Sequence, residues 1–436
     1  MKHTKLFLLV VLFLASCATP ATSAPTLTPT FTPQPTATQT SIPTSTPTVT
    51  PAPTQVGGGS GRLIFTYNKD NKLVSGNNVF VANIDGENLT LITKDNNFNH
   101  LKDISPDGTK VLISSTSDHE GKDATLYLVN LNSPDSKIKL ADGLPNYYGR
   151  NSTAKWLDDK KIIYIGNGET GFGIYLINTD GTNPINIYKV TDNNPKNKPF
   201  EILAIGDDRI YWDAQVTTTQ YYISWSSLDG IEQNPLKFNG KQMFFDKYGG
   251  PPSLAFSPDS TKIAWVEHTA SDHNYLHIAS ISDIDNPYTL DAEPLTSSII
   301  LKWWPDGTKI LVFDKDSVLS FVMKGRIDSA SDLFGIYEVP VTPNSPIINY
   351  HLDVNKMMPF KTETDNNSTA YITADIDLYD ISPDGRQIIC MVYELNSDGE
   401  FERKLSFLDL KTHTFSEASG FTFSNKAIIM DVRWIP

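Results

Sequence analysis

The sequence of 436 residues is poor in cysteine, in positive charge and in long apolar runs. Its two cysteines, Cys17 and Cys390, allow at most one disulfide, which excludes a small fold stapled by several disulfides. Lys and Arg number 36 against 50 Asp and Glu, and the resulting net charge of −14 repels the phosphate backbone of nucleic acids. We therefore expect no nucleic-acid partner.

The sequence also lacks the short motifs of common catalytic centres. No Walker A loop, HExxH or paired CxxC occurs, and GGGSGR fails the G-x-S-x-G pattern at Arg62. The one spacing that suits a metal is that of His268, His273 and His277 in EHTASDHNYLH. These are weak candidates because His277 falls within an expected strand. We predict no catalytic residue, no metal and no cofactor.

The one long apolar run belongs to residues 1–16 and is typical of a targeting segment. Lys2 and Lys5 give it a positive start, and LFLLVVLFLA is short for a bilayer span. It ends in Leu-Ala-Ser-Cys17, which resembles the lipobox of bacterial lipoproteins. The resemblance implies cleavage before Cys17 and acylation of its thiol, with an ordinary secretory signal as the alternative. Cys390, in the apolar run IICMVY, is then an unpaired core residue.

Residues 17–61 are predicted to be a tether. Positions 18–56 contain 14 Thr and 9 Pro among 39 residues and no charged side chain. Such a segment cannot bury a core, and its prolines favour polyproline II geometry. The following VGGGSG is typical of a flexible joint. We therefore expect a lipoprotein signal peptide at 1–16, lipidated Cys17 with the tether at 17–61, and a globular domain at 62–436.

A short motif recurs at regular spacing in the globular domain. SPDGTK at 105–110 returns as SPDSTK at 257–262, WPDGTK at 304–309 and SPDGRQ at 382–387. When WLDDKK, IGDDR and the terminal DVRWIP are aligned with it, the successive intervals are 51, 49, 52, 47, 78 and 53 residues. A period near 50 with four short β-like runs is typical of a propeller. We predict an all-β propeller of four-stranded antiparallel blades.

The aspartates and glycines of the motif are predicted to form turns. Proline presets φ at the first corner, the Asp carboxylate accepts from main-chain amides, and Gly adopts positive φ without strain. A second Asp-Gly turn recurs in NIDGEN (83–88), NTDGTN (178–183) and SLDGIE (227–232) and indicates hairpins. The predicted turn residues are Asp107, Gly108, Asp259, Asp306, Gly307, Asp384 and Gly385.

The repeats resemble the TolB-like, WD-repeat-like propeller family, whose hallmark is an apolar residue followed by SPDG, Lys and an apolar strand. The resemblance covers roughly 62–436 and marks the fold more specifically than the function. TolB-like proteins carry an N-terminal α/β domain, usually have six blades and dock with envelope lipoproteins. Here a Thr/Pro-rich tether stands in place of that domain, and seven units are counted.

The chain ends indicate how the ring closes. The first unit, 62–93, supplies three runs, and the terminal run 428–436 supplies a lone fourth, so pairing them would remove both exposed sheet edges. The other blades are expected at 101–143, 153–190, 201–238, 253–296, 301–350 and 376–419. Six blades is the alternative, because the turns of the third and fourth units are degenerate. The closed ring is expected to be a monomer.

Binding is predicted on the face opposite the turns. Alternate turns of an antiparallel blade emerge on one side, so the PDG and DG turns share a face and the longer loops occupy the other, which we call the variable face. Large side chains gather in its loops and suit a glycan or peptide partner. The alternative is that they fill seams between blades. The candidate partner-binding residues are Tyr147, Tyr148, Phe244, Phe245, Tyr248, Met357 and Phe360, with Met243 and Met358 nearby.

Charges alternate in sign on adjacent innermost strands. In ring order, the position three residues before the motif proline is occupied by Lys302, Asp380, Arg433 and Asp103. We predict that these residues pair with one another where the ring closes. A channel ligand of mixed charge is the alternative interpretation.

These observations favour a non-enzymatic lipoprotein on the extracytoplasmic side of a bacterial membrane, which binds an envelope or extracellular protein or glycan. One alternative is an extracellular carbohydrate-active enzyme, a propeller-type polysaccharide lyase that uses the loop histidines and acidic residues. Another is a structural envelope protein without a soluble ligand.

Overall fold

The computed structural model contains two compact units, Met1–Pro53 and Thr54–Pro436. All described residues belong to the second unit, so the predicted signal segment and most of the tether lie outside them. The described ranges are 61–68, 76–117, 124–145, 152–192, 194–206, 208–217, 220–246, 254–268, 274–291, 299–314, 335–349, 362–363, 369–370, 376–395, 401–412, 414–418, 420–421 and 428–436.

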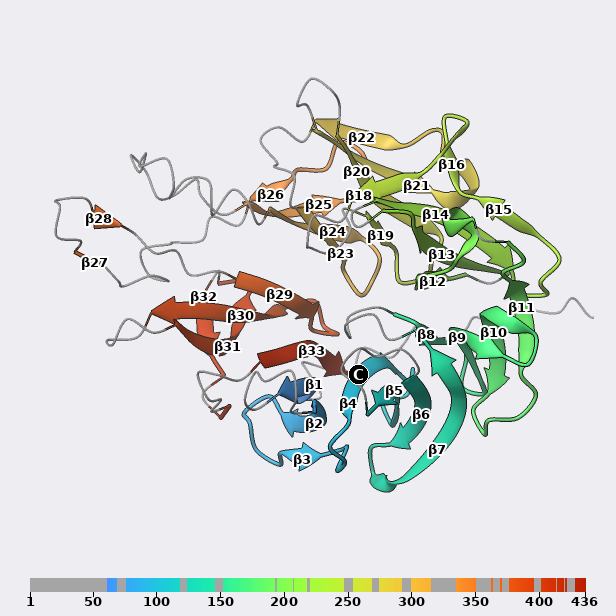
Figure 1. Cartoon of the computed structure of the whole chain (residues 1–436). Coiled ribbons are helices and arrows are strands. Elements are labelled where there is room, and N and C mark those ends of the chain that lie inside the picture. The colour runs from blue at the N-terminus through green and yellow to red at the C-terminus, as the bar shows by residue number, and fades with distance from the viewer. Residues whose placement is uncertain are drawn as a thin grey trace, which may run out of the picture. The chain divides into compact units, whose positions relative to one another are not determined.

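Seven antiparallel sheets form the blades of a propeller, which confirms the predicted fold and the count of seven (Figure 1). From the inside outward, blade 1 is β33 (Ile428–Ile435), β1 (Arg62–Asn68), β2 (Asn78–Asn83) and β3 (Thr90–Leu91). Blade 2 is β4 (Phe98–Ile104), β5 (Lys110–Thr116), β6 (Ala124–Asn130) and β7 (Ser133–Leu144). Blade 3 is β8 (Ala154–Trp156), β9 (Lys161–Gly168), β10 (Gly171–Asn178) and β11 (Ile185–Lys189).

The remaining blades follow in chain order. Blade 4 is β12 (Glu201–Ile205), β13 (Arg209–Gln215), β14 (Gln220–Ser227) and β15 (Gln233–Pro235). Blade 5 is β19 (Leu254–Phe256), β20 (Lys262–His268), β21 (Asn274–Ser280) and β22 (Tyr288–Asp291). Blade 6 is β23 (Ile299–Trp303), β24 (Lys309–Asp314), β25 (Gly335–Pro340) and β26 (Ile348–Asn349). Blade 7 is β29 (Ile376–Ile381), β30 (Gln387–Leu395), β31 (Phe401–Asp409) and β32 (Thr414–Glu417).

The ring closes within blade 1, as the chain ends predict. The last strand, β33, pairs antiparallel with β1, with Leu63 opposite Trp434. The innermost strands meet at the centre of Figure 1, where β33 contacts both β4 and β29. Because the chain's first and last strands lie in one sheet, hydrogen bonds between β1 and β33 hold the ring closed within blade 1.

Apolar side chains fill the seams between blades. Alternation along β14 sends Tyr221 and Ile223 toward blade 5, where they pack with Trp265. On β13, Trp212 points the other way and packs with Ile187 of blade 3. Blade 4 therefore buries both of its faces, which explains why its strands are apolar on both sides.

Blade 4 departs from the repeat at its outer edge. The edge of β14 is paired with β15 at one end and with β18 (Phe244–Asp246) at the other. Between them, β16 (Lys237–Phe238) and β17 (Lys241–Gln242) form a separate hairpin. The Phe238 ring of this hairpin packs edge-on against Trp265 of blade 5 at 5.0 Å between centroids. The outer strand of blade 4 is thus interrupted by a hairpin that reaches the next blade.

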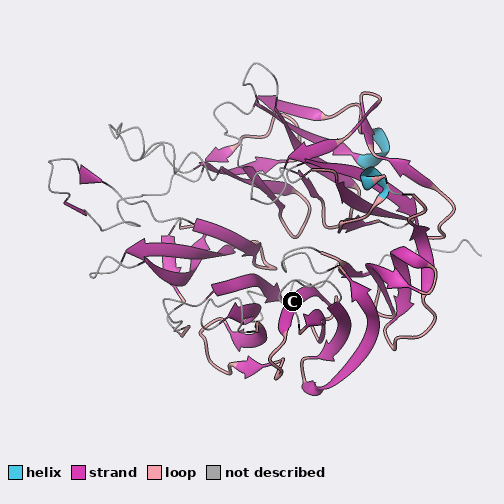
Figure 2. Cartoon of the chain, in the orientation of Figure 1, coloured by secondary structure: helices cyan, strands magenta, loops and turns pink. Residues whose placement is uncertain are grey.

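Helical structure in the described ranges is limited to two single turns, η1 (Pro195–Asn197) and η2 (Ile281–Asp283), and Figure 2 shows strands and loops elsewhere. A separate two-stranded ribbon joins β27 (Thr362–Glu363) to β28 (Thr369–Ala370). Among these same residues, no helix has the length and apolar character needed to cross a bilayer.

Candidate functional site

The motif aspartates lie in turns that use their carboxylates internally. Asp107 accepts from the Ser105 hydroxyl at 2.5 Å and from the Thr109 amide at 3.0 Å. These bonds, that from Ser105 first, lower the pKa of Asp107. Asp259 and Asp384 accept from Ser257 and Ser382 in the same way. At Asp306 the acceptor bond comes from the amide of the second residue on.

The fourth position of the motif requires a left-handed backbone. Gly108, Gly307 and Gly385 have φ values of 66°, 67° and 69°. The equivalent residue in blade 5 is Ser260, which adopts φ of 54° and donates the same turn hydrogen bond to Ser257. The turn is therefore retained in blade 5 despite a side chain that disfavours it.

The alternating charges of the innermost strands pair as the sequence predicts. Lys302 lies 3.6 Å from Asp380, and Arg433 lies 3.6 Å from Asp103. Each aspartate also accepts a hydrogen bond from a main-chain amide of the next blade. Asp380 accepts from Trp434 at 3.1 Å, and Asp103 accepts from Trp156 at 2.9 Å. The Lys302 ammonium also donates to the Tyr379 carbonyl. These contacts join blades 6, 7, 1, 2 and 3.

Two basic groups are enclosed beside this network. Burial lowers the pKa of Lys102 to about 8, against the opposing influence of Asp431 and Glu201. Burial, with Lys102 as the second cause, lowers the pKa of His100 to about 3. The two residues are only 1% and 6% exposed, so they contribute to the interior and offer no surface to a ligand.

The predicted partner-binding residues have different positions. Phe244 is 53% exposed on β18, whereas its neighbour Phe245 is 6% exposed and stacks on Tyr221 at 5.4 Å. Met243 is likewise buried. Phe245 and Met243 therefore fill the seam between blades 4 and 5, and Phe244 reaches the surface. Tyr147, Tyr148, Tyr248, Met357, Met358 and Phe360 lie outside the described residues.

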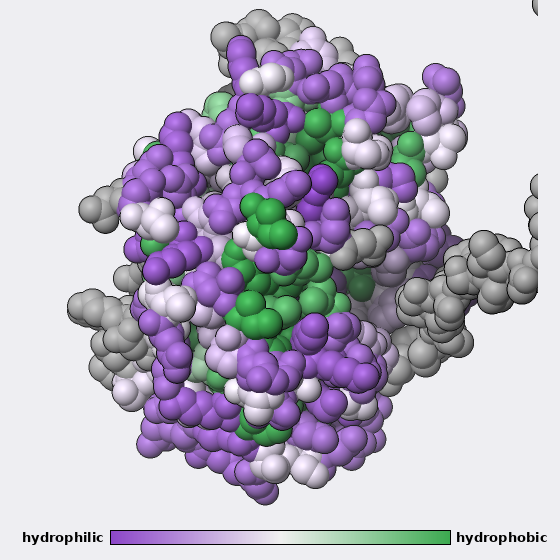
Figure 3. Space-filling model, turned by 90° about the vertical axis from the view of Figure 1, so that its right-hand side faces the viewer, coloured by the Kyte–Doolittle hydropathy of each residue, from purple (hydrophilic) through white to green (hydrophobic). Residues whose placement is uncertain are grey.

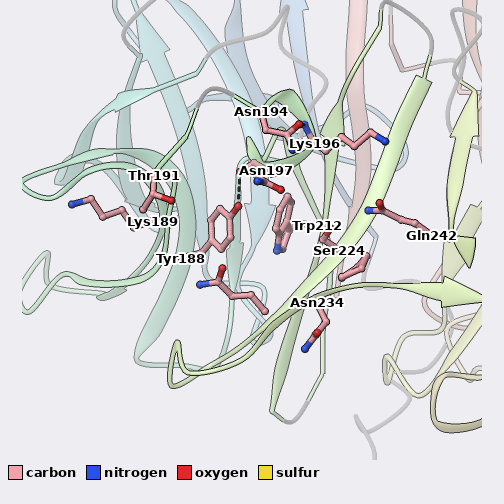
Figure 4. A pocket seen from close by; sticks show the side chains of 12 residues that line it. Tyr188, Lys189, Thr191, Asn194, Lys196, Asn197, Trp212, Ser224, Asn234 and Gln242 are labelled. Atoms are coloured by element: carbon pink, nitrogen blue, oxygen red, sulfur yellow. Dashed lines mark hydrogen bonds between the residues drawn. The ribbon is translucent and has the colours of Figure 1, made fainter. Parts of the chain in front are cut away.

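A polar pocket of about 310 Å³ lies between blades 3 and 4 (Figure 4). At its centre the rings of Tyr188 and Trp212 lie 4.8 Å apart at an angle of 49°. The Tyr188 hydroxyl donates to the Asn197 carbonyl at 2.5 Å, and the Trp212 indole donates to Ser226 at 3.1 Å. Burial raises the pKa of Tyr188 to about 12, so this hydroxyl stays neutral. The lining is Tyr188, Lys189, Thr191, Asn194, Lys196, Asn197, Trp212, Ser224, Gln233, Asn234, Pro235 and Gln242.

The connection from blade 3 to blade 4 is held in shape on one side of this pocket. Asp192 accepts from the Asn194 amide at 3.0 Å and from the Asn197 side chain at 2.9 Å. The Asn194 side chain accepts from the Lys196 amide at 3.1 Å and caps η1. The pocket wall is therefore set before any ligand arrives.

An aromatic surface continues from the pocket along β14. Tyr222 lies on the same face of the strand as Ser224 and is paired in register with Phe244. Their ring centroids are 5.9 Å apart, and the Lys196 ammonium lies 4.1 Å above the Tyr222 ring. We call Lys196, Tyr222 and Phe244 the aromatic shelf.

The histidine triplet is only partly described. The His277 ring is 2.8 Å from the Thr289 hydroxyl and 3.0 Å from Glu267, and it stacks on Trp265. Both ring nitrogens are thus engaged by neighbours in blade 5. The side chains of His268 and His273 lie outside the description, and no cluster of three potential metal ligands occurs among the side chains that are described.

Sequence reasoning did not single out the pocket. A signal was present in TDNNPKNKP (191–199), an amide- and lysine-rich connection that joins blades 3 and 4. The remaining lining residues come from β11, β13, β14, β15 and the hairpin of blade 4, and their association depends on how the two blades pack.

No family model matches the sequence, and no curated protein matches it. Solved structures similar to this chain include TolB from Acinetobacter baumannii, with 14% identity, 67% of this chain and 66% of that chain covered, and a TM-score of 0.40. A puromycin-hydrolysing peptidase from Mycobacterium tuberculosis has 14% identity, coverage of 73% and 45%, and a TM-score of 0.45.

Prolyl endopeptidases give a TM-score of 0.50 at 10% identity. The match covers 86% of this chain and 49% of theirs, so this chain spans about half of their length. At such identities the likeness shows the fold alone, which agrees with the propeller predicted from the SPDG repeat.

Proposed function

We propose that this chain is a non-enzymatic binding protein, held on the extracytoplasmic side of a bacterial membrane by a lipid on Cys17. The propeller would present its variable face to a protein or glycan partner. The Leu-Ala-Ser-Cys17 sequence and the Thr/Pro-rich tether support the anchor. The propeller fold, which commonly serves as a rigid platform for loops, supports the binding role.

The observation that carries the proposal is the aromatic shelf beside the pocket. Phe244 is about half exposed, although Met243 before it and Phe245 after it are buried. Large aromatic side chains at a surface are typical anchors for partners. The internal use of the motif aspartates and of His277 supports a binding role over catalysis by those groups.

The proposal is tested by capturing partners from envelope extract with the full chain. Phe244→Ala should lose the captured partner, whereas Ile231→Ala, a control at a residue 80% exposed on the turn face, should retain it. Equal capture by both variants would contradict the proposal that the partner binds at the variable face. Substrate turnover lost on His273→Ala or with chelator would favour the lyase alternative.

The anchor has a separate test. Cys17→Ser should move the chain from the membrane fraction to the soluble fraction without changing capture. Retention of the variant in the membrane would contradict the lipid anchor.

A further inference from the structure

We propose that the pocket between blades 3 and 4 binds one sugar unit of a glycan, with the next unit lying on the aromatic shelf. This inference rests on the proposed binding function and narrows its partner to a saccharide. Nothing in the repeat requires this pocket, because it lies where blade 4 departs from the pattern of the other blades.

The chemistry of the lining favours hydroxyl groups as ligands. Five of the twelve lining residues are Asn or Gln, and two more are Thr191 and Ser224. Amide and hydroxyl side chains both donate and accept hydrogen bonds, as the hydroxyls of a sugar ring do. None of the described residues that line the pocket carries a carboxylate, although the chain as a whole is strongly acidic.

Several of these groups are open to a ligand. Gln233 and Asn234 on β15 are exposed, as are Thr191 and Asn194 on the opposite wall. Gln242 is held toward the pocket because its amide donates to the Ile223 carbonyl at 3.3 Å. That bond leaves the side-chain oxygen of Gln242 as an acceptor for a ligand hydroxyl.

Size and position support a saccharide. A volume of about 310 Å³ lies at the lower end of the roughly 300–1,000 Å³ range of ligand pockets, which suits a single small polar unit. The aromatic shelf continues the same face of β14, since Tyr222 and Ser224 are two residues apart on this strand and side chains alternate between its faces. Its apolar rings provide a surface for the C–H face of a second sugar unit.

A peptide partner fits this place less well. Peptides commonly add a strand to an exposed sheet edge or insert apolar side chains into a groove. The edge of β14 beside the pocket is already paired with both β15 and β18. Figure 3 shows apolar surface on the side of the molecule that carries β10, β11 and β15, interrupted and bordered by polar residues. The pocket itself is lined mainly by polar side chains.

The two lysines of the lining determine which saccharides are tested. Figure 4 shows Lys189 pointing away from the Tyr188–Trp212 pair. Lys196 is the cation that a ligand on the shelf would meet, because it lies over Tyr222. An acidic saccharide would pair with Lys196, whereas a neutral one would displace it from the ring.

The test measures binding of the full chain to a panel of neutral glucan oligosaccharides and uronic-acid oligosaccharides of matched length. The double variant Asn234→Ala/Gln242→Ala should bind the captured saccharide at least roughly tenfold more weakly, since it removes two hydrogen-bonding groups. Asn132→Ala, an exposed amide in the turn between β6 and β7, should bind like the wild type. Thermal unfolding of each variant identifies any loss that comes from misfolding.

Lys196→Gln assigns the class of saccharide. Weaker binding of the uronic-acid series alone would identify an acidic sugar, and unchanged binding a neutral one. If no saccharide binds, or if the double variant binds as the wild type does, the inference is overturned. Capture of an envelope protein without any saccharide would overturn it and leave the proposed function intact, whereas no capture of either kind would overturn the proposed function.

Discussion

The repeated scaffold and the pocket between blades 3 and 4 treat their polar groups in opposite ways. In the scaffold, Asp380 has both a cation and a main-chain amide as partners, and Asp103 has the same pair from other blades. In the pocket, Gln233 and Asn234 stand exposed at the edge of β15. Polar groups that recur around the ring hold it together, and those that occur once are available for recognition.

The backbone shows the same contrast. The scaffold turns repeat with nearly constant geometry, even where Ser260 replaces glycine. Around the pocket, the outer strand of blade 4 is divided into β15 and β18, and a single helical turn, η1, enters the connection from blade 3. Irregularity in an otherwise repeated fold thus coincides with the pocket and the aromatic shelf.

The largest expected effect is a difference in folding stability between substitutions at two adjacent residues of β18. Phe245→Ala should destabilise the fold by about 3–5 kcal/mol, because it removes a buried ring that stacks on Tyr221. Phe244→Ala should cost less than about 1 kcal/mol, because the ring is half exposed. Urea unfolding measures both. Similar losses for the two variants would mean that the aromatic shelf belongs to the scaffold.

The next effect probes how firmly the scaffold encloses its interior. The pKa of His100 is lowered from 6.5 to about 3 in the folded protein. As the pH falls, the imidazole is therefore protonated in the unfolded chain before it is protonated in the folded one. The stability that depends on neutral His100 is fully present above pH 6.5 and is lost as the pH falls from 6.5 toward 3. At pH 4.5 the loss from this group is about 2.7 kcal/mol, at roughly 1.36 kcal/mol per pH unit.

His100→Gln provides the comparison, because the carboxylates that titrate in the same window are common to both proteins. The variant should lose less stability than the wild type between pH 7 and pH 4.5, as measured by urea unfolding at each pH. If the free energies of unfolding of the two proteins fell in parallel with pH, His100 would be protonated in the folded protein as readily as in the unfolded one, which would contradict its enclosure in the scaffold.

A smaller effect is expected at the joint between blades 7 and 1. Asp380→Ala removes the partner of Lys302 and the acceptor of the Trp434 amide. Since the ion pair is about one-third exposed, we expect a loss of about 2 kcal/mol. Asp380→Asn keeps the acceptor and should lose about 1 kcal/mol. Unchanged urea midpoints in both variants would assign ring closure to seam packing alone.

The scaffold could be predicted from the sequence, whereas the pocket could not. The turn residues repeat about every 50 residues, so the spacing of the SPDG motif was enough to predict the blades. The terminal DVRWIP predicted that the last strand pairs with the first and closes the ring. The predicted pairing of Lys302 with Asp380 and of Arg433 with Asp103 was confirmed because all four residues occupy the same position of the repeat. Such reasoning depends only on local geometry and period.

The pocket depends on packing between blades. Tyr188 and Trp212 belong to different blades and meet only when these pack together. From the sequence, Phe244 and Phe245 were predicted to lie together in a loop. In the structure β18 pairs with β14, so the alternation of side chains along β18 places the Phe244 ring at the surface and the Phe245 ring in the seam. No period in the sequence records that pairing.

The smallest effect tests whether the scaffold turns share one requirement. Ser260→Gly should stabilise the protein by about 0.5–1 kcal/mol, because φ of 54° strains a residue with a Cβ atom more than it strains glycine. Gly307→Ser makes the reverse change at a site where, among the residues that the structure describes, an added Cβ would meet only Pro258, at 3.9 Å, and it should destabilise by about 1 kcal/mol. Thermal unfolding measures both shifts. Opposite signs would show that backbone strain, and not crowding, selects glycine here; a loss in both variants would mean that the Ser260 side chain has a role of its own in blade 5.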